Sequence, residues 1–148
     1  MSILQMYFSF HMIGLVIWLG AAMVLPIALI PALKSLDDAG QAKFMGIFTK
    51  HYIPWFIIAG LVVGVTGLLQ TIHPELAEEM AENAILILKH VVILPLIAIS
   101  VYVWFVLARK LGKLDQDRAH LMQQFVVLSW VQAVLSVAVL IITGILTG

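Results

Sequence analysis

The sequence contains no cysteine, which excludes disulfide bridges, iron–sulfur clusters and thiolate metal sites. Charge is also scarce. Charged residues make up 11% of the 148 residues, whereas soluble domains carry about 25%, so the chain cannot cover the surface of a soluble domain. The formal net charge is zero, which gives no indication of nucleic-acid binding. Hydrophobic residues dominate instead, at 63% with a mean hydropathy of +1.10.

The N-terminal region has no lysine or arginine ahead of its apolar run. That run covers residues 3–33 without a permanently charged side chain, far longer than the apolar stretch of about 7–15 residues in a signal peptide. We therefore expect it to be a membrane-spanning helix and not a cleaved leader.

Four apolar segments follow one another, each longer than the roughly 20 residues that cross a bilayer. They cover residues 3–33, 52–72, 84–107 and 121–146. Short connections require neighbouring helices to be antiparallel. The sequence therefore predicts an all-α integral membrane protein, a single domain of residues 1–148 folded as an up-down four-helix bundle in the lipid bilayer.

The basic residues predict the orientation of this bundle. Seven of the eight lie in or beside the first and third connections: Lys34, Lys43, Lys50, Arg109, Lys110, Lys113 and Arg118. The second connection instead holds four glutamates: Glu75, Glu78, Glu79 and Glu82. The positive-inside rule places connections 34–51 and 108–120 in the cytoplasm and both termini outside.

The first connection is expected to contain its own short interfacial helix, over residues 38–49, because Ala42, Met45 and Phe48 recur there at helical spacing. Pro54 would then lie in the first turn of the second span, where proline is tolerated.

Two histidines lie well inside the apolar spans. His11 is about eight residues from the outer end of the first span, roughly 12 Å deep, and His90 is at a similar depth in the third span. Because the first and third helices run parallel, the two imidazoles could face each other and hold a b-type haem as axial ligands. The alternative is that both are neutral histidines bonded to backbone carbonyls or to hydroxyls.

Lys89 is the one basic residue well inside a span. It could bind an anionic group, such as a haem propionate, or extend outward to the acidic connection. Gly14 and Trp18 follow His11 on nearly the same helical face, so they could shape a pocket for a planar ligand, although core packing is the alternative for Trp18.

Other histidines and methionines offer a second kind of metal site. Cu(I) prefers imidazole and thioether donors, so His11 and His73 could bind it together with the methionines on the outer side: Met1, Met6, Met12 and Met80. His51 and His120 could form an inner site, or simply be interfacial histidines.

Gly60, Gly64 and Gly67 form a stripe of small residues on the second span. Such a stripe lets another helix approach closely, which is typical of a homodimer or of docking against a partner subunit, or it could face a flat ligand.

The pattern His11-x-x-Gly14-x-x-x-Trp18-Leu19-Gly20 resembles the first helix of the copper-resistance protein D domain and of the HemJ-type membrane protoporphyrinogen oxidases. Leu88-Lys89 resembles the lysine of their leucine-rich third helix, and Arg109-Lys110 its basic end. The resemblance implies a prokaryotic inner-membrane protein in which His11 and Lys89 are important. The HemJ-type branch implies haem b and tetrapyrrole oxidation, and the copper-resistance branch implies copper handling on the periplasmic side.

The leading hypothesis is therefore a membrane b-type haem protein whose site involves His11, His90, Lys89, Gly14 and Trp18. It would act in electron transfer, with a redox partner or a quinone, or in a haem-linked oxidation by a membrane oxidoreductase. The alternatives are a copper-binding or copper-transport protein and a non-catalytic membrane subunit.

Overall fold

A computed structural model describes residues 3–72, 84–114 and 117–147, and all the regular structure in these ranges is helical. The first long rod comprises α1 (Ile3–Val24), the π-helix η1 (Leu25–Leu29) and α2 (Ile30–Lys34). It is followed by α3 (Asp38–Thr71). The third rod comprises α5 (Ala84–Val101), the π-helix η2 (Tyr102–Leu107) and α6 (Ala108–Leu111), and the fourth is α7 (Arg118–Thr147).

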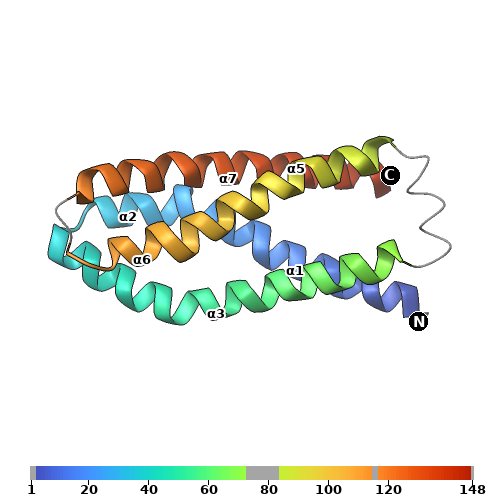
Figure 1. Cartoon of the computed structure of the whole chain (residues 1–148), viewed down its shortest axis with the longest axis horizontal. Helices are drawn as coiled ribbons and strands as arrows, with labels where there is room; N and C mark the ends of the chain where they lie inside the picture. Colours follow the sequence, from blue (N-terminus) through green and yellow to red (C-terminus); the bar gives the residue numbers. More distant parts are fainter. Residues whose placement is uncertain (1–2, 73–83, 115–116, 148) are drawn as a thin grey trace.

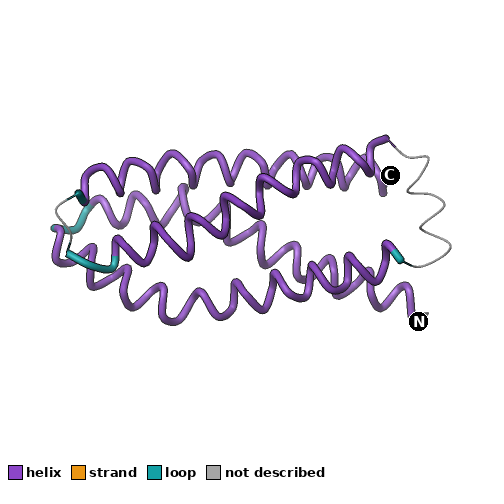
Figure 2. Tube along the Cα trace, in the orientation of Figure 1, coloured by secondary structure: helices purple, strands orange, loops and turns teal. Residues whose placement is uncertain are grey.

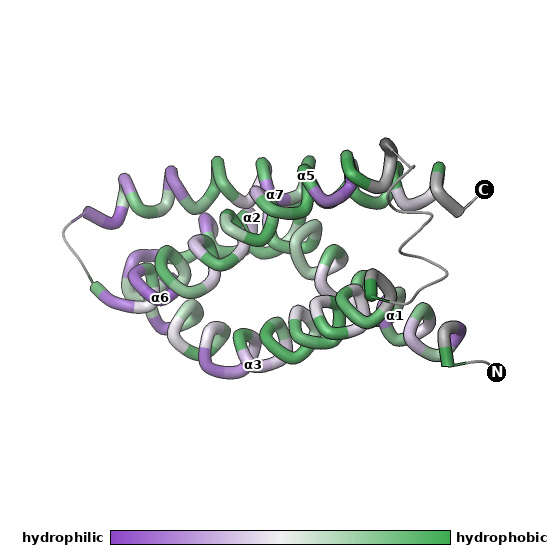
Figure 3. The backbone as a smooth tube through the Cα atoms, turned by 45° about the vertical axis from the view of Figure 1, so that its right-hand side comes forward, coloured by the Kyte–Doolittle hydropathy of each residue, from purple (hydrophilic) through white to green (hydrophobic). Residues whose placement is uncertain are grey.

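These four rods run up and down, and both ends of the chain lie at the same end of the bundle (Figure 1). Each rod contains a helix long and apolar enough to cross a membrane. This agrees with the four predicted spans. The opposite end holds Lys34, Arg109 and Arg118 and is called the basic end below. Hydrophilic residues gather there on α3, α6 and α7 (Figure 3).

The rods pack in two pairs that converge toward the basic end (Figures 1 and 2). α1 packs mainly against α3 and also touches α7, while α5 packs mainly against α7. The most completely buried apolar residues belong largely to the basic half, where all the rods meet; they include Leu33, Met45, Leu107, Leu111 and Phe125. A chain of aromatic contacts joins this core to α1, because Phe56 packs on Trp104 at 5.5 Å and on Trp18 at 5.8 Å between ring centroids.

The prediction of a separate interfacial helix over residues 38–49 is wrong. These residues are the first turns of α3, which runs unbroken from Asp38 to Thr71. Pro54 therefore lies in the interior of this helix and not in its first turn. A proline there removes one helical hydrogen bond without ending the helix, because the residues on both sides continue to favour helical packing.

The two π-helices mark places where the helical register changes. At the end of η1 the Ile30 N–H bonds to the Leu25 carbonyl, and at the end of η2 the Ala108 N–H bonds to the Val103 carbonyl. Both bonds span five residues instead of four. The first lies between two prolines, Pro26 and Pro31, each of which lacks the N–H that an α-helical turn would use.

Arg118 holds the basic end together. Its Nη1 donates to the carbonyls of Leu111, at 2.9 Å, and Lys113, at 2.8 Å, while Nη2 donates to Gln41 Oε1 at 3.2 Å. Its Nε also lies 3.7 Å from a carboxylate oxygen of Asp38. One buried guanidinium therefore ties the α6–α7 connection to the start of α3.

We expect Arg118→Ala to destabilise the bundle by about 2–4 kcal/mol, because it removes several charge-assisted hydrogen bonds at once. Lys110→Ala removes the same charge from an exposed position nearby and should change stability by less than about 0.5 kcal/mol. Thermal unfolding of the purified protein in detergent, followed by circular dichroism, measures both. Equal midpoints for the two variants would contradict this role.

Candidate functional site

His11 lies in a buried polar environment near the end of the bundle opposite the basic end. The side chain is 8% exposed and lies between α1 and α3. Its Nδ1 is 3.1 Å from the Val63 carbonyl oxygen and 3.1 Å from Thr66 Oγ1. α3 therefore fixes the imidazole from one side.

The hydrogen-bonding network assigns the tautomer of His11. A carbonyl oxygen can only accept, so Nδ1 must carry the proton that is shared with Val63. The Thr66 hydroxyl donates its own hydrogen to the Val62 carbonyl at 2.5 Å and so accepts from His11. The other ring nitrogen, Nε2, then carries a lone pair. This is how proteins orient a histidine that ligates a metal through the opposite nitrogen.

Gly67 brings the backbone of α3 close to this ring. A Cβ atom at this position would lie 3.1 Å from Cε1 and 3.5 Å from Nδ1 of His11. Only glycine leaves the imidazole in its observed place without a shift. The sequence pattern did not predict a role for Thr66, although it is a polar residue at nearly the same depth in the second span as His11 in the first, and it predicted Gly67 only as part of the glycine stripe.

Lys89 is the second polar group near His11. It is partly buried on α5, and it lies close enough to His11 for a direct Coulombic interaction. Among the described residues no carboxylate pairs with it. The structure thus places two of the predicted site residues, one on α1 and one on α5, within electrostatic range of each other.

His90 has a different environment. Its side chain is exposed on α5, and consecutive helical residues point about 100° apart, so His90 and Lys89 do not share a direction. The predicted pairing of His11 with His90 stays a prediction, and it would require the His90 side chain to turn inward.

Gly14 and Trp18 take packing positions. A Cβ at Gly14 would lie 2.8 Å from Val63 Cγ2, so α3 fills the space that Gly14 was expected to leave open beside the imidazole. Trp18 is 6% exposed and packs against Phe56 in the core. Its indole N–H has no hydrogen-bond partner within the part of the chain that the structure describes. For both residues the described contacts are those of helix packing.

The remaining predicted metal ligands are scattered. Met6 is exposed and Met12 packs against the core, while His73, Met1 and Met80 lie outside the described residues. His51 is exposed on α3, and His120 is exposed on α7, where it accepts a hydrogen bond from Gln124 at 2.9 Å. Within the described ranges no three His, Asp or Glu side chains cluster as a metal site.

The glycine stripe on α3 divides into two parts. Gly67 packs against His11 within the chain, whereas a Cβ at Gly60 or Gly64 would meet nothing within 4 Å. Docking of a second helix at Gly60 and Gly64 stays a prediction, and Gly67 already serves the α1–α3 contact.

No protein family, no curated protein and no solved structure matches this chain. The resemblance to the copper-resistance protein D domain and to HemJ-type oxidases therefore stays a prediction.

We expect Gly67→Ala to destabilise the protein by about 1 kcal/mol or more relative to Gly64→Ala. The new methyl group at residue 67 crowds the imidazole, and overpacking in a filled site typically costs about 1–3 kcal/mol. At residue 64 the methyl group meets open space, and replacing a helical glycine by alanine stabilises by about 0.5–1 kcal/mol. Thermal unfolding of the two variants in detergent provides the comparison, and identical midpoints would contradict the close contact at His11.

Proposed function

We propose that this protein is a multi-pass membrane protein that binds a b-type haem near the end of the bundle opposite the basic end, with His11 as an axial ligand. The observation that carries the proposal is the orientation of His11, whose Nδ1 proton is held by Val63 and Thr66 so that Nε2 is left with a lone pair. The four apolar helices support the membrane location, and the basic residues of the connections support a cytoplasmic basic end.

The residues around His11 fit a haem better than a bare metal ion. A metal ion bound by side chains alone commonly needs three or four ligands, and the described residues offer no such cluster. A haem iron needs only one or two protein ligands because the macrocycle supplies four nitrogens. Lys89 would hold a propionate, since it is partly buried, close to His11 and without a carboxylate partner among the described residues.

When bound, the haem would supply one-electron redox chemistry, which suits electron transfer or a haem-linked oxidation. The chain's own contribution is to bind and orient. Thr66 and Val63 keep the proton on Nδ1 of His11, and hydrogen bonding at that nitrogen raises the basicity of the ligating one. Apolar residues exclude water from the site, because the flanking Leu15 and Leu19 are each 2% exposed.

A set of matched His→Ala variants tests the proposal. Reduced-minus-oxidised spectra of protein purified from haem-replete cells should show a sharp α band. His11→Ala should abolish the band, whereas His120→Ala, an exposed histidine at the basic end, should retain it. His90→Ala should also retain bound haem, because its side chain is exposed.

The outcomes separate the parts of this proposal. A colourless wild-type protein would overturn haem binding, and a retained band in His11→Ala would overturn the assigned ligand. Loss of haem in His90→Ala would instead support the prediction that His11 and His90 are both ligands, which was based on their similar depths.

Thr66→Val keeps the volume of the side chain but removes the hydroxyl that accepts from His11. We expect haem affinity to fall roughly tenfold, at the lower end of the 10–100-fold effect of such supporting residues, because the Val63 carbonyl still holds Nδ1. Titration of haem into the apo-protein measures the change. Thr49→Val is the matched control, since the Thr49 hydroxyl bonds within the basic half of α3. An unchanged affinity in Thr66→Val would show that the threonine does not support the ligand.

A further inference from the structure

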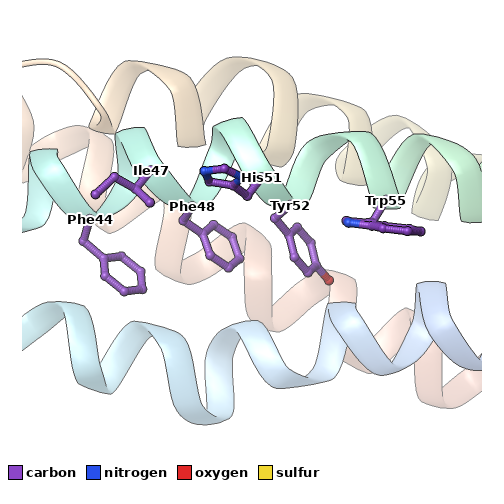
Figure 4. A pocket seen from close by; sticks show the side chains of 6 residues that line it. All are labelled: Phe44, Ile47, Phe48, His51, Tyr52 and Trp55. Carbon is purple, nitrogen blue, oxygen red and sulfur yellow. The ribbon is translucent and has the colours of Figure 1, made fainter.

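A second feature of α3 lies near the basic end, away from His11. Six side chains on one face of this helix line an open groove of about 420 Å³ (Figure 4). They recur at helical spacing: Phe44, Ile47, Phe48, His51, Tyr52 and Trp55. The volume falls within the range of about 300–1,000 Å³ that is typical of small-molecule sites.

The floor of this groove is rigid and its rim is open. Tyr52 stacks on Phe48 at 4.7 Å and packs against Trp104 of η2 at 4.9 Å between ring centroids. Trp55, by contrast, is 68% exposed and Ile47 is 55% exposed. The groove therefore presents a packed aromatic surface to the outside of the bundle.

The dimensions of the groove suit one leaflet of a bilayer. Its lining runs from Phe44 to Trp55, which is roughly 16 Å of helix at 1.5 Å per residue. The hydrocarbon core of a bilayer is about 30 Å thick, so one leaflet contributes about half of that. A lipid aligned with α3 could therefore lie along the groove, with its headgroup beside the first half and the start of an acyl chain along the second half.

Two lysines flank the groove on one side. Lys43 and Lys50 are seven residues apart on α3, so they project in nearly the same direction, next to Ile47. Both are exposed, and neither has a carboxylate partner among the described residues. Basic residues at this level attract the anionic headgroups of the cytoplasmic leaflet.

We propose that this groove binds one anionic phospholipid, with its headgroup phosphate at Lys43 and Lys50 and an acyl chain over Phe48 and Trp55. The charges favour this occupant over a second copy of the chain, because a symmetric dimer through the groove would bring the lysines of both copies together. This proposal rests on the membrane location and orientation proposed above but not on haem binding, because the groove is distinct from the site at His11. A colourless protein that retains the lipid would overturn only the haem proposal.

Native mass spectrometry of the full chain, released from bilayers of phosphatidylcholine with phosphatidylglycerol, tests the headgroup contact. The wild type should retain one phosphatidylglycerol in preference to phosphatidylcholine. The double variant Lys43→Gln/Lys50→Gln should reduce that retention roughly tenfold or more. Lys110→Gln/Lys113→Gln removes the same charge from two other exposed lysines at the basic end and should retain the lipid. Equal retention of both lipids by the wild type, or equal losses in both double variants, would overturn the proposal, as would a lipid-free dimer that Lys43→Gln/Lys50→Gln preserves.

Fluorescence quenching tests the acyl-chain contact. Phosphatidylglycerol with brominated chains should quench the wild type more than brominated phosphatidylcholine does, because bromine would lie against Trp55. Trp55→Phe should lose this difference. Trp130→Phe removes a second exposed tryptophan, which lies on α7 instead of α3, and should keep it. The same quenching by both lipids in the wild type, or loss of the difference only in Trp130→Phe, would overturn the placement on α3.

Discussion

Polar groups inside this bundle must find their partners within the protein, because the residues around them are almost all apolar. Arg118 donates to backbone carbonyls at the basic end, and His11 donates to α3. The buried hydroxyls of α7 each donate to the carbonyl four residues earlier: Ser129, Ser136 and Thr143. Gln132 is an exception, since it is fully buried and neither polar atom of its amide group has a hydrogen-bond partner among the described residues. The contacts of Arg118 and His11 therefore join different helices, whereas the hydroxyl contacts lie within α7.

The main features of the fold follow from the sequence, because the length and apolarity of the four segments are enough to identify them as helices that could cross a membrane. The details at the basic end do not. Helical spacing over residues 38–49 correctly indicated a helix, but it could not show that the helix continues through Pro54 into the second span. Proline in a bundle interior is tolerated when neighbouring helices pack around it, and that packing is a property of the assembled structure. The π-helix η2 contains no proline or glycine, so no local sequence pattern predicts it.

At the candidate site, the depth of His11 in the first span predicted that it is buried, and the structure agrees. Depth gives only the position along a helix, however, and not the direction in which a side chain points. His90 matches His11 in depth but is exposed, whereas Lys89 beside it interacts with His11. The contacts that orient the imidazole come from α3, where Thr66 was the available signal. Pairing of α1 with α3 could not be deduced from spacing within either helix.

The π-helix η1 has a consequence for how His11 is placed. A turn closed by a bond over five residues accommodates one residue more than an α-helical turn, and one residue corresponds to about 100° of rotation about the helix axis. The angular position of His11 is therefore set partly by the number of residues in Leu25–Leu29, roughly 20 Å away along the rod. Shortening that segment by one residue would let a regular α-helix run through, but it would turn α1 by about 100° relative to α2. The extra residue in η1 thus sets the angular relation between α2 at the basic end and α1, which carries His11 and packs mainly on α3.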